Sequence, residues 1–248
     1  MLVGHRGLGR GTVGEHRENT VGSMLAALAA GADWLEIDVC RTADQSLVAH
    51  HNPALPDGRF LVDVRRAEAE DTGVVGLDTL VDALPEGVPV VLDVKSVLED
   101  ATDPASRRTT ALLRPLLPAV VRRRQVLVMS FDPAALLELR DAEPGAAYGL
   151  LGWVDFPLRH LVASAAALRL DVVGVHHGSF RANRIEPAHV HRPPAHSIEA
   201  AHSAGLEVLA WCPEPTVAID LVAAGVDALC LNDLPDAVPL LRAAVNAG

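Results

Sequence analysis

Runs of β-branched and aliphatic residues alternate with Ala/Leu-rich stretches along almost the whole chain. This alternation predicts strands joined by helices, and therefore a mostly parallel α/β sheet. The predicted strands lie near residues 1–5, 33–39, 47–51, 89–94, 126–130, 147–151, 172–176, 207–212 and 227–232. That is one strand more than an eight-stranded barrel contains.

The extra strand has a local explanation in residues 33–51. Two strand patterns are separated there by a short polar turn at Asp44 and Gln45, whereas a parallel crossover needs roughly a dozen residues or more. We therefore expect an antiparallel hairpin, in which the numbers of facing residues add up to about 89, so that His51 lies opposite Asp38. The remaining eight strands predict a TIM (β/α)8 barrel.

A charged and turn-rich stretch, residues 52–88, interrupts the alternation and is expected to form a small insertion over the barrel mouth. The length of 248 residues fits one barrel, so a single domain over residues 1–248 is expected. A doubly wound open sheet is the alternative, although no GxGxxG follows the first strand. In the first helix, Asn19 or Thr20 can cap the start and Gly31 can end it.

The formal net charge of −11 argues against a nucleic-acid partner, which would require a basic face. An acidic chain that binds phosphate needs a metal ion or a few focused cations. Cys40, Cys212 and Cys230 are widely spaced and odd in number, so no disulfide framework is expected. Without a leader pattern or an apolar run of about 18 residues, we expect a cytoplasmic protein with no transmembrane segment. The sequence leaves the oligomeric state open.

Charged residues gather at the predicted C-terminal ends of the first strands, which share one mouth in a barrel. Glu36 and Asp38 are two positions apart, so both carboxylates leave the same face and need a compensating cation. Asp93 from the next barrel strand would complete three oxygen ligands suited to Mg²⁺ or Ca²⁺, and Lys95 could neutralise a phosphate oxygen. Glu36 and Asp38 alone would also fit a solvent-facing strand, and Asp93 with Lys95 an exposed ion pair.

Two histidines from different strands, His5 and His51, should face the same metal. A pair of imidazoles can share the proton transfers of a substitution at phosphorus, although a single strand-end histidine is usually only a hydrogen-bonded polar residue. Arg6 can bind two phosphate oxygens at once. An ion pair between Arg6 and Glu18 is an equally good interpretation.

These residues occur in an order that resembles the glycerophosphodiester phosphodiesterase family. The resemblance rests on "HRG", "ENT", "EIDV", a histidine after a hairpin, an acidic-x-Lys strand, "SFD", "VLAW" and "GVDALCLNDLP". It implies a barrel that uses a divalent cation to hydrolyse glycerophosphodiesters to sn-glycerol 3-phosphate and an alcohol, in lipid and glycerol metabolism. By resemblance, the acid/base pair is His5 and His51, and the metal ligands are Glu36, Asp38 and Asp93. The resemblance also implies that the phosphate is clamped by Arg6 and Lys95, with Glu18 as a supporting residue. Trp211 is similar to an aromatic residue at the substrate mouth, although it would also fit a core position.

Three positions depart from the family pattern. His51 is followed by Asn52 where an aspartate is usual, Asp93 replaces a glutamate, and "WCPE" replaces "WTVN". The related sphingomyelinase D barrels also have an aspartate at the position of Asp93. Two alternatives therefore stay open: cleavage of lysophospholipids in the manner of a lysophospholipase D or sphingomyelinase D, and a barrel that binds metal and phosphate without turnover.

Overall fold

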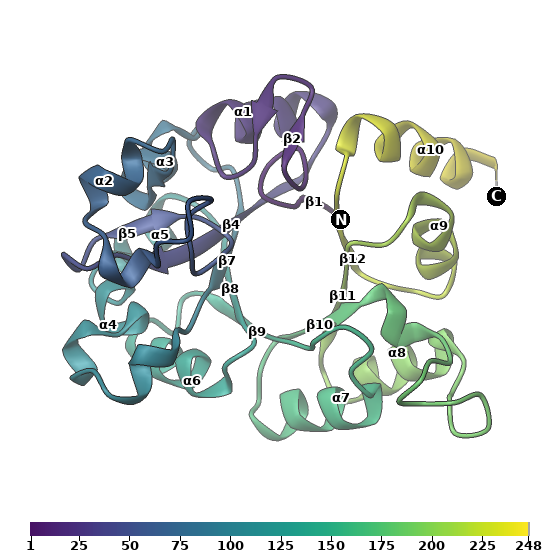
Figure 1. The fold of residues 1–248 in the computed structure, drawn as a ribbon. Helices are drawn as coiled ribbons and strands as arrows, with labels where there is room; N and C mark the ends of the chain where they lie inside the picture. The colour runs from purple at the N-terminus through teal and green to yellow at the C-terminus, as the bar shows by residue number, and fades with distance from the viewer. Residues whose placement is uncertain (248) are drawn as a thin grey trace.

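Eight parallel strands close into a barrel in the computed structural model, which describes residues 1–247 and the side chains of residues 1–244 (Figure 1). The barrel order is β1-β4-β7-β8-β9-β10-β11-β12, and β1 pairs with both β4 and β12. The predicted TIM barrel is confirmed. The barrel strands are β1 (Leu2–Gly4), β4 (Trp34–Arg41), β7 (Val90–Val94), β8 (Val126–Ser130), β9 (Ala147–Leu151), β10 (Val172–His176), β11 (Glu207–Trp211) and β12 (Ala228–Leu231).

Helices surround the barrel (Figure 1). They are α1 (Val21–Ala30), α2 (Arg66–Glu70), α3 (Leu77–Ala83), α4 (Thr109–Leu113), α5 (Leu117–Arg123), α6 (Pro133–Ala142), α7 (Leu158–Ala167), α8 (Pro194–Ser203), α9 (Pro215–Ala223) and α10 (Leu234–Ala247), with 3-10 turns η1 (Leu61–Asp63), η2 (Leu98–Ala101), η3 (Ala105–Arg107) and η4 (His177–Phe180). Helix α1 begins as predicted, because the Thr20 side chain accepts a hydrogen bond from the Ser23 amide. It ends at Gly31, whose φ of 101° suits glycine.

The predicted hairpin is present, but its register differs by one residue. Strand β5 (Leu47–Ala49) runs antiparallel to β4, with Val39 opposite Ala49, so His50, and not His51, lies opposite Asp38. The reason is a three-residue turn: the Thr42 amide donates to the Ser46 carbonyl, and Gln45 adopts a left-handed φ of 61°. His51 lies beyond the end of β5, where the ladder no longer fixes its direction.

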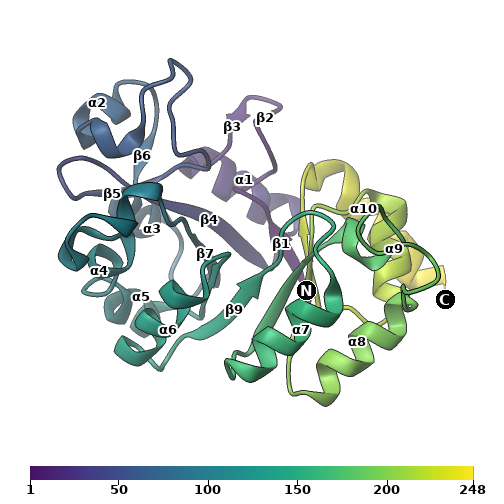
Figure 2. The ribbon, with the colours of Figure 1, turned by 60° about the horizontal axis from the view of Figure 1, so that its bottom comes forward.

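The segment after the hairpin begins at the barrel mouth and continues along the hairpin's outer face. Asn52 and Pro53 line the cavity described below, and Figure 2 shows α2 and β6 (Val75–Gly76) beside the hairpin. A small hydrophobic core fixes this insertion against the hairpin, formed by Cys40, Val48, Leu55, Leu61, Val64, Ala69 and Val74. A second short hairpin, β2 (Thr12–Val13) and β3 (His16–Arg17), follows β1.

The interior of the barrel is filled by side chains, so the functional cavity opens at one end only. Val3, Val91, Leu127, Met129, Leu151, Val172, Leu209, Ala228 and Cys230 form this inner core. Gly149 and Gly174 leave room for Met129, because a Cβ on either glycine would lie within 3.0 Å of the Met129 Cε. Within residues 1–247, none of the helices combines the length and apolar character needed to cross a membrane.

Candidate active site

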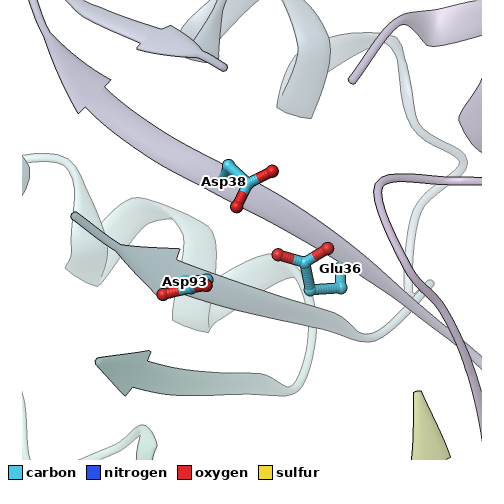
Figure 3. A group of neighbouring side chains, drawn as sticks. All are labelled: Glu36, Asp38 and Asp93. Carbon is cyan, nitrogen blue, oxygen red and sulfur yellow. The ribbon is translucent and has the colours of Figure 1, made fainter. Parts of the chain in front are cut away.

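Three buried carboxylates converge at the C-terminal end of the barrel. Asp38 lies directly opposite Asp93 in the parallel pairing of β4 with β7, and Glu36 precedes Asp38 by two residues on the same strand. Each residue offers an oxygen within 4.8 Å of the others. Figure 3 shows the three side chains on two neighbouring strands. The predicted convergence of Glu36, Asp38 and Asp93 is therefore observed.

Glu36 and Asp93 are poorly stabilised in their charged forms, because burial raises the pKa of each. Burial raises the pKa of Glu36 well above its usual range, and the neighbouring Asp38 and Asp93 raise it further. Burial also raises the pKa of Asp93, whose Oδ1 is buried and has no hydrogen-bond partner within the part of the chain that the structure describes. Three hard oxygen donors, one of them unpaired, match the preferences of Mg²⁺ and Ca²⁺. The residues present thus fit a divalent cation.

Asp38 is the hub of a hydrogen-bonded network. Its Oδ1 accepts from Lys95 Nζ at 2.9 Å and lies 3.0 Å from His51 Nδ1. Its Oδ2 accepts from Asn19 Nδ2 at 2.8 Å and lies 3.4 Å from Arg6 Nε. Burial alone would raise the pKa of Asp38, but Lys95, His51 and Arg6 hold it well below its usual range. Asp38 is therefore charged.

Arg6 is held in place by the carboxylates of Glu36, Glu18 and Asp38. Its backbone amide donates to Glu36 Oε2 at 2.7 Å, and its guanidinium donates to Glu18 Oε2 at 3.0 Å. Arg6 has a left-handed φ of 55° and lies immediately after the end of β1. The expected ion pair with Glu18 is present, and the same guanidinium also lies beside Asp38.

Asn232 determines which nitrogen of neutral His5 carries the proton. Its Oδ1 accepts a hydrogen bond from the Arg10 amide at 3.0 Å and lies 2.7 Å from His5 Nδ1. Because this oxygen can only accept, His5 Nδ1 is the donor and Nε2 keeps the lone pair. Arg6 Nε donates to that Nε2 at 3.2 Å. The lone pair on His5 Nε2 is thus engaged by Arg6 in the unliganded site.

A cavity of about 780 Å³ joins these groups at the barrel mouth. Of the residues predicted from the sequence, His5, Arg6, Glu18, Glu36, His51, Asp93, Lys95 and Trp211 line it. Asp38 is fully buried behind them. Asn19 and Asn232 were not predicted as site residues, although position 232 directly follows the last barrel strand.

Family comparison agrees with this geometry. The model of the Glycerophosphoryl diester phosphodiesterase family matches residues 5–236. The chain belongs to this family. It is accordingly an enzyme that hydrolyses phosphodiesters, a glycerophosphodiester phosphodiesterase. No curated protein sequence matches the chain significantly.

Solved structures show the same fold. A phosphodiesterase from Oleispira antarctica, solved with the product sn-glycerol-3-phosphate, has a TM-score of 0.75 at 18% identity, covering 99% of this chain and 96% of that one. Two glycerophosphodiester phosphodiesterases are also similar in fold. The enzyme from Parabacteroides distasonis has a TM-score of 0.74 at 18% identity, covering 99% of this chain and 97% of that one. The enzyme from Thermotoga maritima has a TM-score of 0.72 at 17% identity, covering 96% of this chain and 97% of that one.

The family departure at Asn52 does not leave His51 without an acidic partner. Asn52 is exposed at the cavity, whereas His51 Nδ1 contacts the carboxylate of Asp38. The imidazole of His51 is therefore oriented by a residue of β4 and not by its neighbour in the sequence.

His176, at the far side of the cavity, makes stability depend on pH. Burial and the nearby His177 lower its pKa to about 4, although Asp155 opposes this. Since the unfolded pKa is about 6.5, protons bind the unfolded chain more strongly, and the free energy of unfolding should fall as the pH drops from about 6.5 to about 4. In urea unfolding across this interval, the wild type should lose more stability than His176→Gln. Parallel curves would contradict this prediction.

Proposed function

We propose that this enzyme cleaves glycerophosphodiesters to sn-glycerol 3-phosphate and an alcohol with a divalent cation at Glu36, Asp38 and Asp93. The observation that carries the proposal is that both His5 and His51 line one cavity with Glu36 and Asp93, and that Asp38 is buried beside these two carboxylates. When bound, Mg²⁺ or Ca²⁺ would polarise the phosphate and offset the negative charge that develops during substitution.

The two histidines have different partners, which supports different roles. His5 is paired with the neutral Asn232 and keeps a lone pair on Nε2, which suits a general base. His51 is paired with the charged Asp38, a partner that stabilises an imidazolium and suits a general acid. Binding of the phosphate by Arg6 would release the Nε2 of His5, since Arg6 Nε donates to that atom in the unliganded site.

Arg6 and Lys95 are the proposed phosphate clamps. Both guanidinium and ammonium lie beside Asp38, and Lys95 also contacts Asp93. Burial opposes the charge of Lys95, but Asp93, Asp38 and Glu36 raise its pKa, so it stays cationic. Glu18 supports the clamp by holding the Arg6 guanidinium. Two cations held beside the carboxylates can bind phosphate oxygens and offset their charge.

The test is release of glycerol 3-phosphate from glycerophosphocholine, measured with and without a chelator. We expect chelation to lower the rate by at least about tenfold and added Mg²⁺ or Ca²⁺ to restore it, because a metal contributes several kcal/mol to such reactions. Activity that survives thorough removal of metal would overturn the proposed metal dependence. If the protein binds the diester but does not hydrolyse it with any of the metal ions tested, the alternative of a barrel that binds metal and phosphate without turnover would be favoured.

One observation favours lysophospholipids as a second candidate substrate. The loop after β9 exposes three large apolar side chains: Trp153 (63%), Val154 (53%) and Phe156 (36%), and the first two line the cavity. Exposed apolar groups at a cavity rim can contact an acyl chain. Assaying lysophosphatidylcholine beside glycerophosphocholine separates the two: a higher kcat/KM for the lysolipid would replace the small diester as the proposed substrate.

A further inference from the structure

Rings from four consecutive barrel strands line one side of the cavity. Phe131, Trp153, His176 and Trp211 follow or end β8, β9, β10 and β11, and we call them the aromatic wall. Phe131 stacks on Trp153 with centroids 4.3 Å apart and meets Trp211 edge-on at 6.2 Å. His176 meets Trp211 at 4.4 Å. These contacts make the wall continuous.

The composition of the chain makes this gathering significant. Phe, Trp and Tyr account for only 3% of the residues, yet three of them line this cavity. Trp153 keeps 63% of its surface exposed although its ring is stacked, so its position is not explained by burial in the core. An exposed, ordered aromatic face beside a reaction centre is a surface for a ligand.

The faces of these rings attract positive charge. The ammonium of Lys95 already lies 5.9 Å from the centroid of Phe131, over the ring. His176 adds no positive charge near neutral pH, because burial and His177 lower its pKa to about 4. Its Nδ1 is already occupied as the acceptor of the Gly178 amide. The wall therefore offers negative ring faces to its ligand.

The hydrogen-bonding capacity of the wall narrows the kind of cation. Ring carbon atoms accept no ordinary hydrogen bonds, and the indole nitrogen of Trp211 can only donate; it is buried without a partner among the described residues. A primary ammonium can only donate, and it would lose hydrogen bonds to water here without replacement because the wall offers it no acceptor. A quaternary ammonium has no N–H or O–H to satisfy and gains cation–π attraction.

We propose that the aromatic wall binds a quaternary ammonium group on the leaving alcohol, so that choline esters of glycerol phosphate are the preferred substrates. The inference rests on the proposed function for the position of the phosphate, which Arg6 and Lys95 would hold beside the carboxylates. The wall then selects the alcohol while the charged side of the cavity carries the reaction.

The experiment compares glycerophosphocholine with its uncharged isostere, the 3,3-dimethylbutyl ester of glycerol phosphate. The two have the same shape, so hydrophobic contact contributes equally and only the charge differs. We expect kcat/KM for the choline ester to be roughly 3- to 30-fold higher, as cation–π attraction predicts. Equal values would overturn the inference. Lysophosphatidylcholine is assayed as a third substrate, because it carries the same choline group on a lipid. Its kcat/KM shows whether the enzyme also accepts choline from a lipid.

Substitutions then test whether the preference for the choline ester comes from the aromatic wall. In Trp153→Leu the ratio of the two kcat/KM values should fall toward one, whereas Trp153→Phe keeps a ring face and should retain most of it. Phe60→Leu is the matched control, since Phe60 is also exposed (51%) but is not among the residues that line the cavity; its ratio should equal that of the wild type. A ratio unchanged in Trp153→Leu would overturn the assignment to the wall.

Binding of choline alone, measured by calorimetry, separates this inference from the proposed function. If no diester is hydrolysed but choline binds to the wild type and not to Trp153→Leu, the wall is supported and the proposed reaction is rejected. If choline fails to bind and both esters are hydrolysed equally well, the reaction stands and the wall is rejected.

Discussion

Replacing His5 or His51 by alanine is expected to lower kcat/KM for glycerophosphocholine by about 10² to 10⁴-fold, the usual contribution of a positioned acid or base. His5 Nε2 carries the lone pair and His51 is held on Asp38, so each variant removes one end of the proton transfer. The double variant should lose about as much as the more damaging single one, because groups that act as a unit are not additive. Steady-state kinetics at saturating metal measures both effects.

His50→Ala is the matched control for His51→Ala. The two histidines are adjacent, but His50 Nε2 lies 3.3 Å from the Ala54 carbonyl and His50 is not among the residues lining the cavity. The rate of this variant should stay within about threefold of the wild type, because His50 does not line the cavity in which substrate is proposed to bind. A His50 effect as large as that of His51, or full activity in His5→Ala, would contradict the acid/base pair.

Asp38→Ala is expected to lower the free energy of unfolding by about 3 to 5 kcal/mol in the presence of a chelator. The substitution would leave Lys95 and Arg6 as buried cations without their shared counterion, and removing one partner of a buried ion pair has this magnitude. Because its neighbours hold the pKa of Asp38 well below its usual range, its contribution is present above the unfolded pKa of about 3.9. It is lost as the pH falls through the lower folded pKa.

Asp93→Ala is expected to lower the free energy of unfolding less than Asp38→Ala does. Burial raises the pKa of Asp93, and none of the described residues forms a hydrogen bond with its Oδ1, so the folded protein without metal stabilises this charge poorly. We expect Asp93→Ala to cost clearly less than Asp38→Ala in urea unfolding with chelator. Equal losses for the two variants would contradict the assignment of Asp38 as the hub.

The barrel was predictable because hydrophobic patterning and turn length are properties of the sequence itself. The hairpin register was not, since it depends on Gln45 adopting a left-handed conformation in a three-residue turn, and glutamine gives no sign of this. The hairpin of β2 and β3 was also missed. Strands of two residues are too short to show a periodicity.

The candidate site was predictable as a place because the strand ends of a barrel meet at one mouth. This rule gathered the carboxylates, His5, His51 and Lys95, whose roles stay predictions. Asn19 was interpreted only as a possible helix cap, whereas its side chain contacts Asp38. Asn232 carries no charge to attract attention, although the strand-end rule covers it. Uncharged residues that orient charged ones need coordinates to be recognised.

The aromatic wall and the charged side of the cavity come from different parts of the chain. Residues up to Lys95 supply the carboxylates, the clamps and both histidines, while the rings follow strands between residues 126 and 211. If both proposals hold, reactivity and selectivity are carried by separate parts of the chain. Exchange of the loops after β8 and β9 would then be expected to change the preferred alcohol while the residues proposed for the reaction stay in place.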